Sequence, residues 1–308
     1  MWCTPRLHIG AFTFLLYIND LSSICKYTLP FLFADDTSLM AIGDDISQLQ
    51  NVINQELAAI ATWLKVNKLS LNIKKTQFIL FTRKKCQNTS IHLNIDGANI
   101  SQVTETKFLG VYIDSQLNWK RHISYISGKV ARGIGILIKA RHYLSKQCLV
   151  SLYYSFIYPY LIYCNHIWGT AYVSNLSRLT ILQKKAVRII CHAKFRSHSD
   201  PLFRNLGLLK FIDINRYLFG RFMFRVVHGD VPDIFGGFFR YNRELHEYNT
   251  RYSNHLNIST VKSNLRKSCI KFRGAYIWNS ILAAGINQNV SDYVFSRQLK
   301  NCIAMGIL

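Results

Sequence analysis

Acidic side chains are scarce in this sequence: 16 Asp and Glu residues stand against 38 Lys and Arg residues, and the formal net charge is +22. Residues 1–60 hold six acidic and two basic side chains, whereas the stretch between Asp114 and Asp200 holds no acidic side chain at all. Proteins that are merely basic and soluble intersperse both signs on their surface. The separation of charge therefore favours a protein that binds a polyanion, and nucleic acid is the usual one.

Closely spaced cysteines and long apolar runs are also missing. The eight cysteines form no C-x-x-C pair, which argues against a zinc site or a disulfide framework and favours a reducing compartment. The apolar run at residues 11–18 is short for a signal peptide, and residues 149–168 include five Tyr, a Pro, an Asn and a His, which a spanning helix tolerates poorly. Both segments are predicted to be buried helices; a membrane protein built on residues 149–168 is the alternative.

Two adjacent carboxylates, Asp35 and Asp36, lie between two apolar segments in "YTLPFLFADDTSLMAIGDD". We expect strands at about residues 27–33 and 38–42, which would place the pair at the turn of an antiparallel hairpin. The next segment, residues 44–69, carries apolar side chains at helical spacing after an acidic capping residue. The prediction is a hairpin backed by one helix.

Further along the chain the pattern changes from strands to helices. Strands are expected at residues 76–81 and 91–95, with an Asp96–Gly97 turn leading into 98–100, and one more strand at 106–114. Apolar spacing predicts helices near residues 123–137, 145–164, 175–192 and 208–228, and the last eighty residues are expected to be more irregular. The predicted fold class is α+β, with a strand-containing unit to about residue 115 followed by helices.

Adjacent carboxylates on a hairpin suit the binding of a divalent metal. Mg²⁺ takes hard oxygen ligands and binds through one or two carboxylates together with substrate phosphates. Two such ions stabilise the attacking and leaving oxygens of a phosphoryl displacement. The alternative is a purely local role, because Asp is favoured in turns by its own hydrogen bonds to the backbone.

Several motifs resemble those of one enzyme family in their order and separation. The segments "LLYINDL", "FADDTSL", "WLKVNKLSLNIKKTQFILF" and "TKFLGVYIDSQLNW" resemble the reverse transcriptases of non-LTR retrotransposons of the jockey-like LINE type. The likeness continues through "YYSFIYPYLIYCNHIWG", "LQKKAVRII" and "RGAYIWNSI". The resemblance implies a partial polymerase palm over residues 1–115, a helical thumb-like region over 116–200 and a basic C-terminal region over 201–308.

The resemblance also implies site residues for the RNA-templated addition of deoxynucleotides to a DNA 3′ end with Mg²⁺. Asp35 would be a direct metal ligand, and Asp36 its neighbour with a weaker role. Lys75 matches the palm lysine placed near the phosphates of the incoming nucleotide; its alternative is a solvated surface lysine. These three residues are the expected catalytic set.

Two further groups follow from the same resemblance. The strand that positions the primer end would contribute Phe108, Leu109 and Gly110, for which the alternative is a plain buried strand. Nucleic-acid phosphates would be contacted from one helix by Lys184, Lys185 and Arg188, giving salt-dependent affinity without sequence readout. The implied partners are an RNA template, a DNA primer or target and, in an active enzyme, deoxynucleotides, with no membrane. The implied location is intracellular, in the nucleus or the cytoplasm as a ribonucleoprotein.

The start of the chain departs from the family pattern. Family members carry fingers, a palm strand with another catalytic Asp and a "PQGS…LGPLLF" segment before "LLYIND", whereas this sequence reads "MWCTPRLHIGAFTFLLYIND" from Met1. We therefore expect a truncated copy that is inactive alone, because two carboxylates without the third do not hold both metals. The alternatives are a non-enzymatic, basic nucleic-acid-binding remnant and an untranslated relic.

Overall fold

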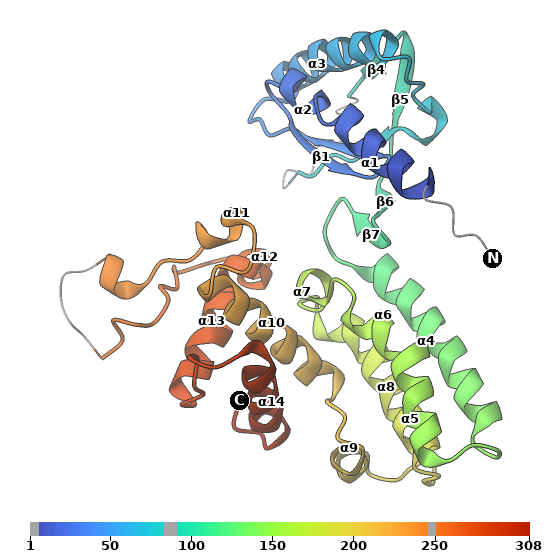
Figure 1. The fold of residues 1–308 in the computed structure, drawn as a ribbon, viewed down its shortest axis with the longest axis vertical. Coiled ribbons are helices and arrows are strands. Elements are labelled where there is room, and N and C mark those ends of the chain that lie inside the picture. The colour runs from blue at the N-terminus through green and yellow to red at the C-terminus, as the bar shows by residue number, and fades with distance from the viewer. Residues whose placement is uncertain (1–5, 83–90, 246–250) are drawn as a thin grey trace. The chain divides into compact units, whose positions relative to one another are not determined.

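The computed structural model describes residues 6–82, 91–245 and 251–308 (Figure 1). The chain divides into two compact units. Unit 1 runs to Thr106 and includes residues 114–116, and unit 2 comprises residues 107–113 and 117–308. Unit 1 holds the first strands and unit 2 is mainly helical, so the chain is of the mixed α and β class expected from the sequence.

Unit 1 begins with α1 (Arg6–Ile18) and α2 (Leu21–Ile24), followed by the strands β1 (Leu29–Phe33) and β2 (Asp36–Met40) and the helix α3 (Ile46–Val66). The two strands pair antiparallel, as predicted, and α3 begins where the side chain of Asp45 accepts a hydrogen bond from the backbone N–H of Gln48. A small core joins hairpin and helix, because Leu32 and Leu39 pack with Ile60 of α3.

A second, three-stranded sheet in unit 1 has the order β3–β5–β4, with β3 (Gln77–Phe78), β4 (Leu93–Ile95) and β5 (Ala98–Gln102). The predicted Asp96–Gly97 turn is confirmed: both residues have positive φ, as a two-residue hairpin turn requires. The expected strand at 76–81 is shorter than predicted. It follows a 3₁₀ helix, η1 (Ile73–Lys75), and pairs over two residues only.

The third strand pair, β6 (Glu105–Phe108) and β7 (Val111–Asp114), corrects the prediction of one continuous strand over 106–114. Leu109 and Gly110 both have positive φ, at 43° and 84°, so the backbone reverses between the two strands. A glycine adopts this conformation readily, whereas a leucine does so rarely. The sequence signal was a run of strand-forming residues in which one glycine marked the turn.

Unit 2 holds the remaining helices, which are α4 (Lys120–Ala140), α5 (Lys146–Phe156), α6 (Tyr158–Ile162), α7 (Asn165–Trp168), α8 (Val173–Ile190), α9 (Asp200–Leu206), α10 (Phe211–Val227), α11 (Asp233–Gly236), η2 (Asn242–Glu244, a 3₁₀ helix), α12 (Asn264–Ser268), α13 (Ile270–Ala283) and α14 (Asp292–Ala304). They share one large core that draws on both the 116–200 and the 201–308 parts of the chain. The predicted helices over 123–137, 175–192 and 208–228 are confirmed as α4, α8 and α10.

Two helix predictions in unit 2 were wrong. The single helix expected at 145–164 is broken at Ile157 (φ −120°, ψ −53°), after which Pro159 opens α6. Proline lacks a backbone N–H and clashes with the preceding turn, so a helix does not run through it. The last eighty residues are more regular than expected, because they form α13 and α14, both with buried residues along one side. In the described parts of the chain, no helix has the length and apolar character needed to cross a membrane.

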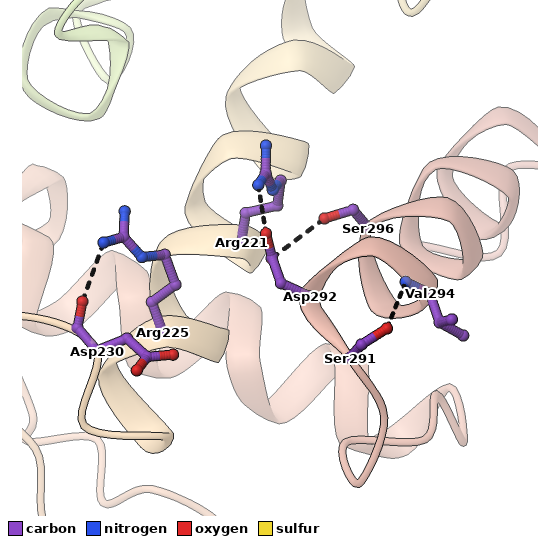
Figure 2. Close-up of polar contacts among 7 residues, drawn as sticks. All are labelled: Arg221, Arg225, Asp230, Ser291, Asp292, Val294 and Ser296. Atoms are coloured by element: carbon purple, nitrogen blue, oxygen red, sulfur yellow. Dashed lines mark hydrogen bonds and ion pairs between the residues drawn. The ribbon is translucent and has the colours of Figure 1, made fainter.

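Side-chain bonds join α10 to α14 (Figure 2). Arg221 of α10 forms an ion pair with Asp292 in the first turn of α14, with 2.6 Å between nitrogen and oxygen. The Ser291 hydroxyl accepts from the backbone N–H of Val294 and caps the helix. The two helices also meet at Gly220, where a Cβ would lie 2.6 Å from the end of the Leu299 side chain, so a larger residue there would require Leu299 to shift.

Candidate functional site

Asp35 and Asp36 lie at the tip of the β1–β2 hairpin, as the sequence predicts. The turn consists of Ala34 and Asp35, with Ala34 at φ 51°, and Asp36 faces Phe33 as the last pair of the ladder. Both carboxylates are exposed. The hairpin therefore presents two adjacent hard-oxygen donors to solvent. In the described ranges of the chain, no group of three or more His, Cys, Asp or Glu side chains is placed to hold a metal ion.

An apolar face accompanies this tip. Three alternate residues of β1, namely Leu29, Phe31 and Phe33, have 56%, 49% and 62% of their surface exposed. Alternate side chains of a strand share one face, so the exposed side of β1 is a row of large apolar groups. A row of this kind is characteristic of a surface that another element covers.

Lys75 is exposed at the end of η1 in unit 1. Within the described residues, no hydrogen bond or ion pair joins it to Asp35 or Asp36. The structure thus keeps Lys75 in the same unit as the carboxylate tip, with a side chain open to a ligand. Among the described residues, the structure shows no contact of Lys75 that would identify it as a catalytic lysine and not a surface lysine.

Phe108, Leu109 and Gly110 form the end of β6 and the turn into β7, and so are not a buried strand. Phe108 and Leu109 are half-buried, and Gly110 is exposed. The turn is fixed to the end of α6, since the Tyr163 hydroxyl donates to the Leu109 carbonyl at 2.6 Å. Sequence reasoning missed Tyr163, for which only the tyrosine-rich segment around it gave a signal.

A basic aromatic cluster follows this turn within unit 2. The rings of Tyr112 and Tyr125 meet edge to face with 5.2 Å between centroids. Lys107 lies 5.5 Å and Lys129 also 5.5 Å from the centroid of the Tyr125 ring, and Arg121 lies 5.1 Å from that of Tyr112. Cations over aromatic faces are attracted by the ring quadrupole. Sequence reasoning did not find this cluster, because its members come from β6, β7 and α4.

The three basic residues expected to face phosphates lie on α8, in different environments. Lys185 is exposed, and Lys184 is half-buried. Arg188 donates from Nε to the Ser197 carbonyl at 2.9 Å. Lys185 is thus the one open to solvent, whereas Arg188 also fastens the segment that follows α8.

The helical unit also contains one strongly perturbed histidine. His122 is buried in α4, where its Nδ1 accepts from the backbone N–H of Tyr112 at 3.3 Å and its ring meets Trp168 edge to face. Burial lowers the pKa of His122 to about 4. The imidazole is therefore neutral at physiological pH, and it fastens β7 to α4.

The chain is similar to curated proteins that carry a shared activity in their names. It is 29% identical over 198 residues to the RNA-directed DNA polymerase from mobile element jockey of Drosophila melanogaster. This alignment covers 63% of this chain and 21% of that protein. The probable RNA-directed DNA polymerases from transposon BS and transposon X-element of the same species are 24% and 25% identical, over 57% and 68% of this chain. The chain is a homologue of the RNA-directed DNA polymerases of non-LTR retrotransposons.

The similarity has a limited extent in these relatives. The chain spans about a fifth of the length of the curated proteins that it matches, from 20% to 24% for the three polymerases named. No protein-family model matches the chain, and no solved structure matches it. The comparisons show homology to polymerases of this kind, and the role of each residue is argued from the site itself.

Proposed function

We propose that these 308 residues are part of the catalytic polymerase of a non-LTR retrotransposon, with the carboxylate tip of the palm in unit 1 and a nucleic-acid-binding thumb and C-terminal region in unit 2. The proposed partners are an RNA template and a DNA primer or target. The observation that carries the proposal is the Asp35–Asp36 pair, exposed at the turn of an antiparallel hairpin in a homologue of RNA-directed DNA polymerases.

The residues present fit Mg²⁺ in part. Asp35 and Asp36 offer the oxygen donors that Mg²⁺ prefers, and the phosphates of a nucleotide would complete the coordination of one ion. A site for two ions needs further ligands, and the described residues bring no third His, Cys, Asp or Glu to this pair. We propose that other residues of a polymerase complete the site, and that they cover the exposed Leu29, Phe31 and Phe33 as well.

It follows that the 308 residues by themselves do not extend a primer. Positioning and electrostatic stabilisation supply most of the rate in phosphoryl transfer, and an exposed carboxylate pair without a third ligand gives little of either. The test is primer extension on an RNA template with Mg²⁺ or Mn²⁺, beside an Asp35→Ala variant. Extension that is lost in Asp35→Ala would contradict the proposal, because it would show a complete site in this chain.

Nucleic-acid binding by unit 2 rests on its positive charge and on the absence of acidic residues between Asp114 and Asp200. Each phosphate that is neutralised contributes about −0.9 to the slope of log affinity against log salt on duplex DNA. A chain that contacts six or more phosphates then loses about 10³-fold in affinity between 50 and 200 mM salt. An affinity that stays flat with salt would contradict the proposal.

Lysine variants locate this binding. Lys184→Ala combined with Lys185→Ala should reduce the slope of log affinity against log salt by up to the contribution of about two phosphate contacts. Lys26→Ala is the control, because Lys26 is an exposed lysine of unit 1, outside the stretch between Asp114 and Asp200 that lacks acidic residues. Arg188→Ala is a weaker test, since loss of its bond to the Ser197 carbonyl also disturbs the local fold.

The second candidate is a non-enzymatic, basic nucleic-acid-binding protein. The same charge distribution supports it, and it requires nothing of the hairpin. The two candidates differ in what Asp35 does when the rest of a polymerase is supplied. Addition of a separately expressed polymerase segment from a jockey-type relative should restore extension that depends on Asp35 in the first case, and no extension in the second.

A further inference from the structure

Unit 2 contains a cavity of about 180 Å³ whose lining residues are separate from the proposed site residues. Its walls come from α5, α6, α10 and α14 and from the segment that precedes α10. The residues of interest are four tyrosines, one leucine and one lysine: Tyr153, Tyr154, Tyr158, Tyr217, Leu209 and Lys300. Four tyrosines around one small cavity form a surface that is aromatic on its walls and polar at its hydroxyl groups.

Three of the tyrosine rings pack against one another. Tyr154 and Tyr158 meet edge to face with 5.1 Å between centroids, and Tyr153 and Tyr154 with 5.6 Å. Tyr153 is fully buried, and its hydroxyl accepts from the Gln183 side chain at 2.9 Å. Tyr154 is 40% exposed. The cavity therefore has a buried, hydrogen-bonded inner wall and one aromatic ring at its edge that a ligand can reach.

The hydroxyl groups keep their protons at neutral pH. Burial, together with the neighbouring Tyr154 and Tyr217, raises the pKa of Tyr158 to about 12. Burial also raises the pKa of Tyr154. Across the described residues, neither the Tyr154 nor the Tyr158 hydroxyl has a hydrogen-bond partner. Both hydroxyls are thus free to donate to an acceptor in the cavity.

A positive charge, that of Lys300, also lies beside the cavity. Arg221 of α10 lies near Tyr217, but its charge is matched by the ion pair with Asp292 (Figure 2). Lys300 lies two turns after Asp292 in α14. It is half-buried and has no ion-pair partner among the described residues. A half-buried ammonium without a carboxylate favours an anionic ligand, and phosphate is the anion that a nucleic acid supplies.

We propose that this cavity binds a single unpaired nucleobase of a nucleic-acid strand, with the base against the tyrosine rings and Leu209 and the adjoining backbone phosphate at Lys300. Ligand pockets for whole drug-sized molecules measure roughly 300–1,000 Å³, so a cavity of about 180 Å³ admits one ring system and leaves sugar and phosphate outside. Stacking on aromatic side chains is tolerant of sequence, because every base has a π face. The inference rests on the proposed nucleic-acid binding by unit 2 and adds a preference for single strands.

The preference for single strands follows from the geometry. A base within a duplex reaches such a cavity only after it is unstacked and unpaired, which costs a few kcal/mol. The chain should therefore bind a fluorescein-labelled oligothymidylate of about twelve nucleotides through the cavity. A duplex of the same length should be bound through phosphate contacts alone.

The first test compares variants of the full 308-residue chain with these two probes. Tyr154→Ala should weaken oligothymidylate binding about tenfold, within the range for loss of one stacked base, and should change duplex binding less than twofold. Tyr154→Phe keeps the ring and should retain most of the affinity. Lys300→Gln should weaken oligothymidylate binding and reduce its salt slope by about 0.7, the value for one phosphate contact on a single strand.

Matched controls are available outside the cavity. Tyr293→Ala removes a tyrosine of α14 that is 75% exposed, and Lys271→Gln removes an exposed lysine of α13. Both controls should bind oligothymidylate within twofold of the unmodified chain. Circular dichroism establishes that each variant is folded. If Tyr154→Ala does not fold, Lys300→Gln and cross-linking decide the question.

Cross-linking locates the base directly. An oligonucleotide that contains 4-thiothymidine should cross-link to the peptides that carry Tyr154 and Tyr158, or Tyr217, as read by mass spectrometry. If the chain binds neither probe, the proposed nucleic-acid function fails. If it binds both probes, but Tyr154→Ala and Lys300→Gln match their controls and the cross-links map elsewhere, only the cavity assignment is overturned.

Discussion

Gln183 should be one of the most sensitive positions in unit 2. It is fully buried in α8, and its side chain makes three hydrogen bonds. Its Nε2 donates to the Tyr153 hydroxyl at 2.9 Å and to the Leu209 carbonyl at 3.0 Å, and its Oε1 accepts from the Phe211 N–H at 2.8 Å. Phe211 is the first residue of α10, so its N–H has no partner within that helix.

Gln183→Leu keeps the approximate size of the side chain and removes all three bonds. A buried polar group left without a partner costs about 1–3 kcal/mol, so three such groups predict a loss of about 3 kcal/mol or more in the free energy of unfolding. With a denaturant slope of about 2 kcal/mol per molar urea, the unfolding midpoint should fall by more than about 1 M. Tryptophan fluorescence reports this transition, because Trp168 and Trp278 are fully buried in unit 2.

A double-mutant cycle sharpens the prediction. Tyr153→Phe alone should cost about 1 kcal/mol, since it leaves one amide hydrogen of Gln183 unpaired. In the Gln183→Leu background the same change should be neutral or stabilising, because the Tyr153 hydroxyl has already lost its donor. A loss below about 1 kcal/mol for Gln183→Leu, or equal effects of Tyr153→Phe in both backgrounds, would refute this account of the core.

Three further predictions concern single positions. Asp36→Asn should leave the thermal midpoint unchanged or raise it, because it removes one of two adjacent exposed negative charges; a clear drop in calorimetry would reveal a stabilising partner of Asp36. Gly110→Ala should cost about 1 kcal/mol in urea unfolding, because φ there is 84°; no loss would show that the turn adapts. Since the folded-state pKa of His122 lies near 4, below the ordinary 6.5, the unfolded chain takes up the proton first, so stability should fall by roughly 3 kcal/mol as pH drops from 6.5 to 4. His122→Gln should flatten that profile, and an unchanged profile would mean that another group titrates.

Much of unit 1 could be predicted from local sequence. The hairpin at Asp35–Asp36 follows from two short apolar runs around a polar pair, and the Asp96–Gly97 turn from a dipeptide that tolerates positive φ. The start of α3 follows from an acidic capping residue, for which the sequence offers Asp44 or Asp45 and the structure uses Asp45. Each of these features depends on interactions between residues only a few positions apart, which is why the pattern of residues was enough.

Features that depend on residues far apart in the chain could not be predicted in this way. The turn at Leu109–Gly110 lies in a segment with the composition of a strand, and Tyr163, 54 positions from Leu109, holds it. Arg188 had the same sequence signal as Lys185, yet only the fold gives it the Ser197 carbonyl as a partner.

The sequence by itself determined the homology to retrotransposon polymerases, the charge separation and the position of the carboxylate pair, because these are properties of composition and of local pattern. The tertiary structure alone decided which side chains are open to a ligand. The cavity around Tyr154 and Lys300 is the clearest case, since its walls come from residues 153, 154, 158, 208, 209, 217 and 300. Side chains that distant become neighbours only when the helices pack, and packing depends on the shapes of all the buried groups together.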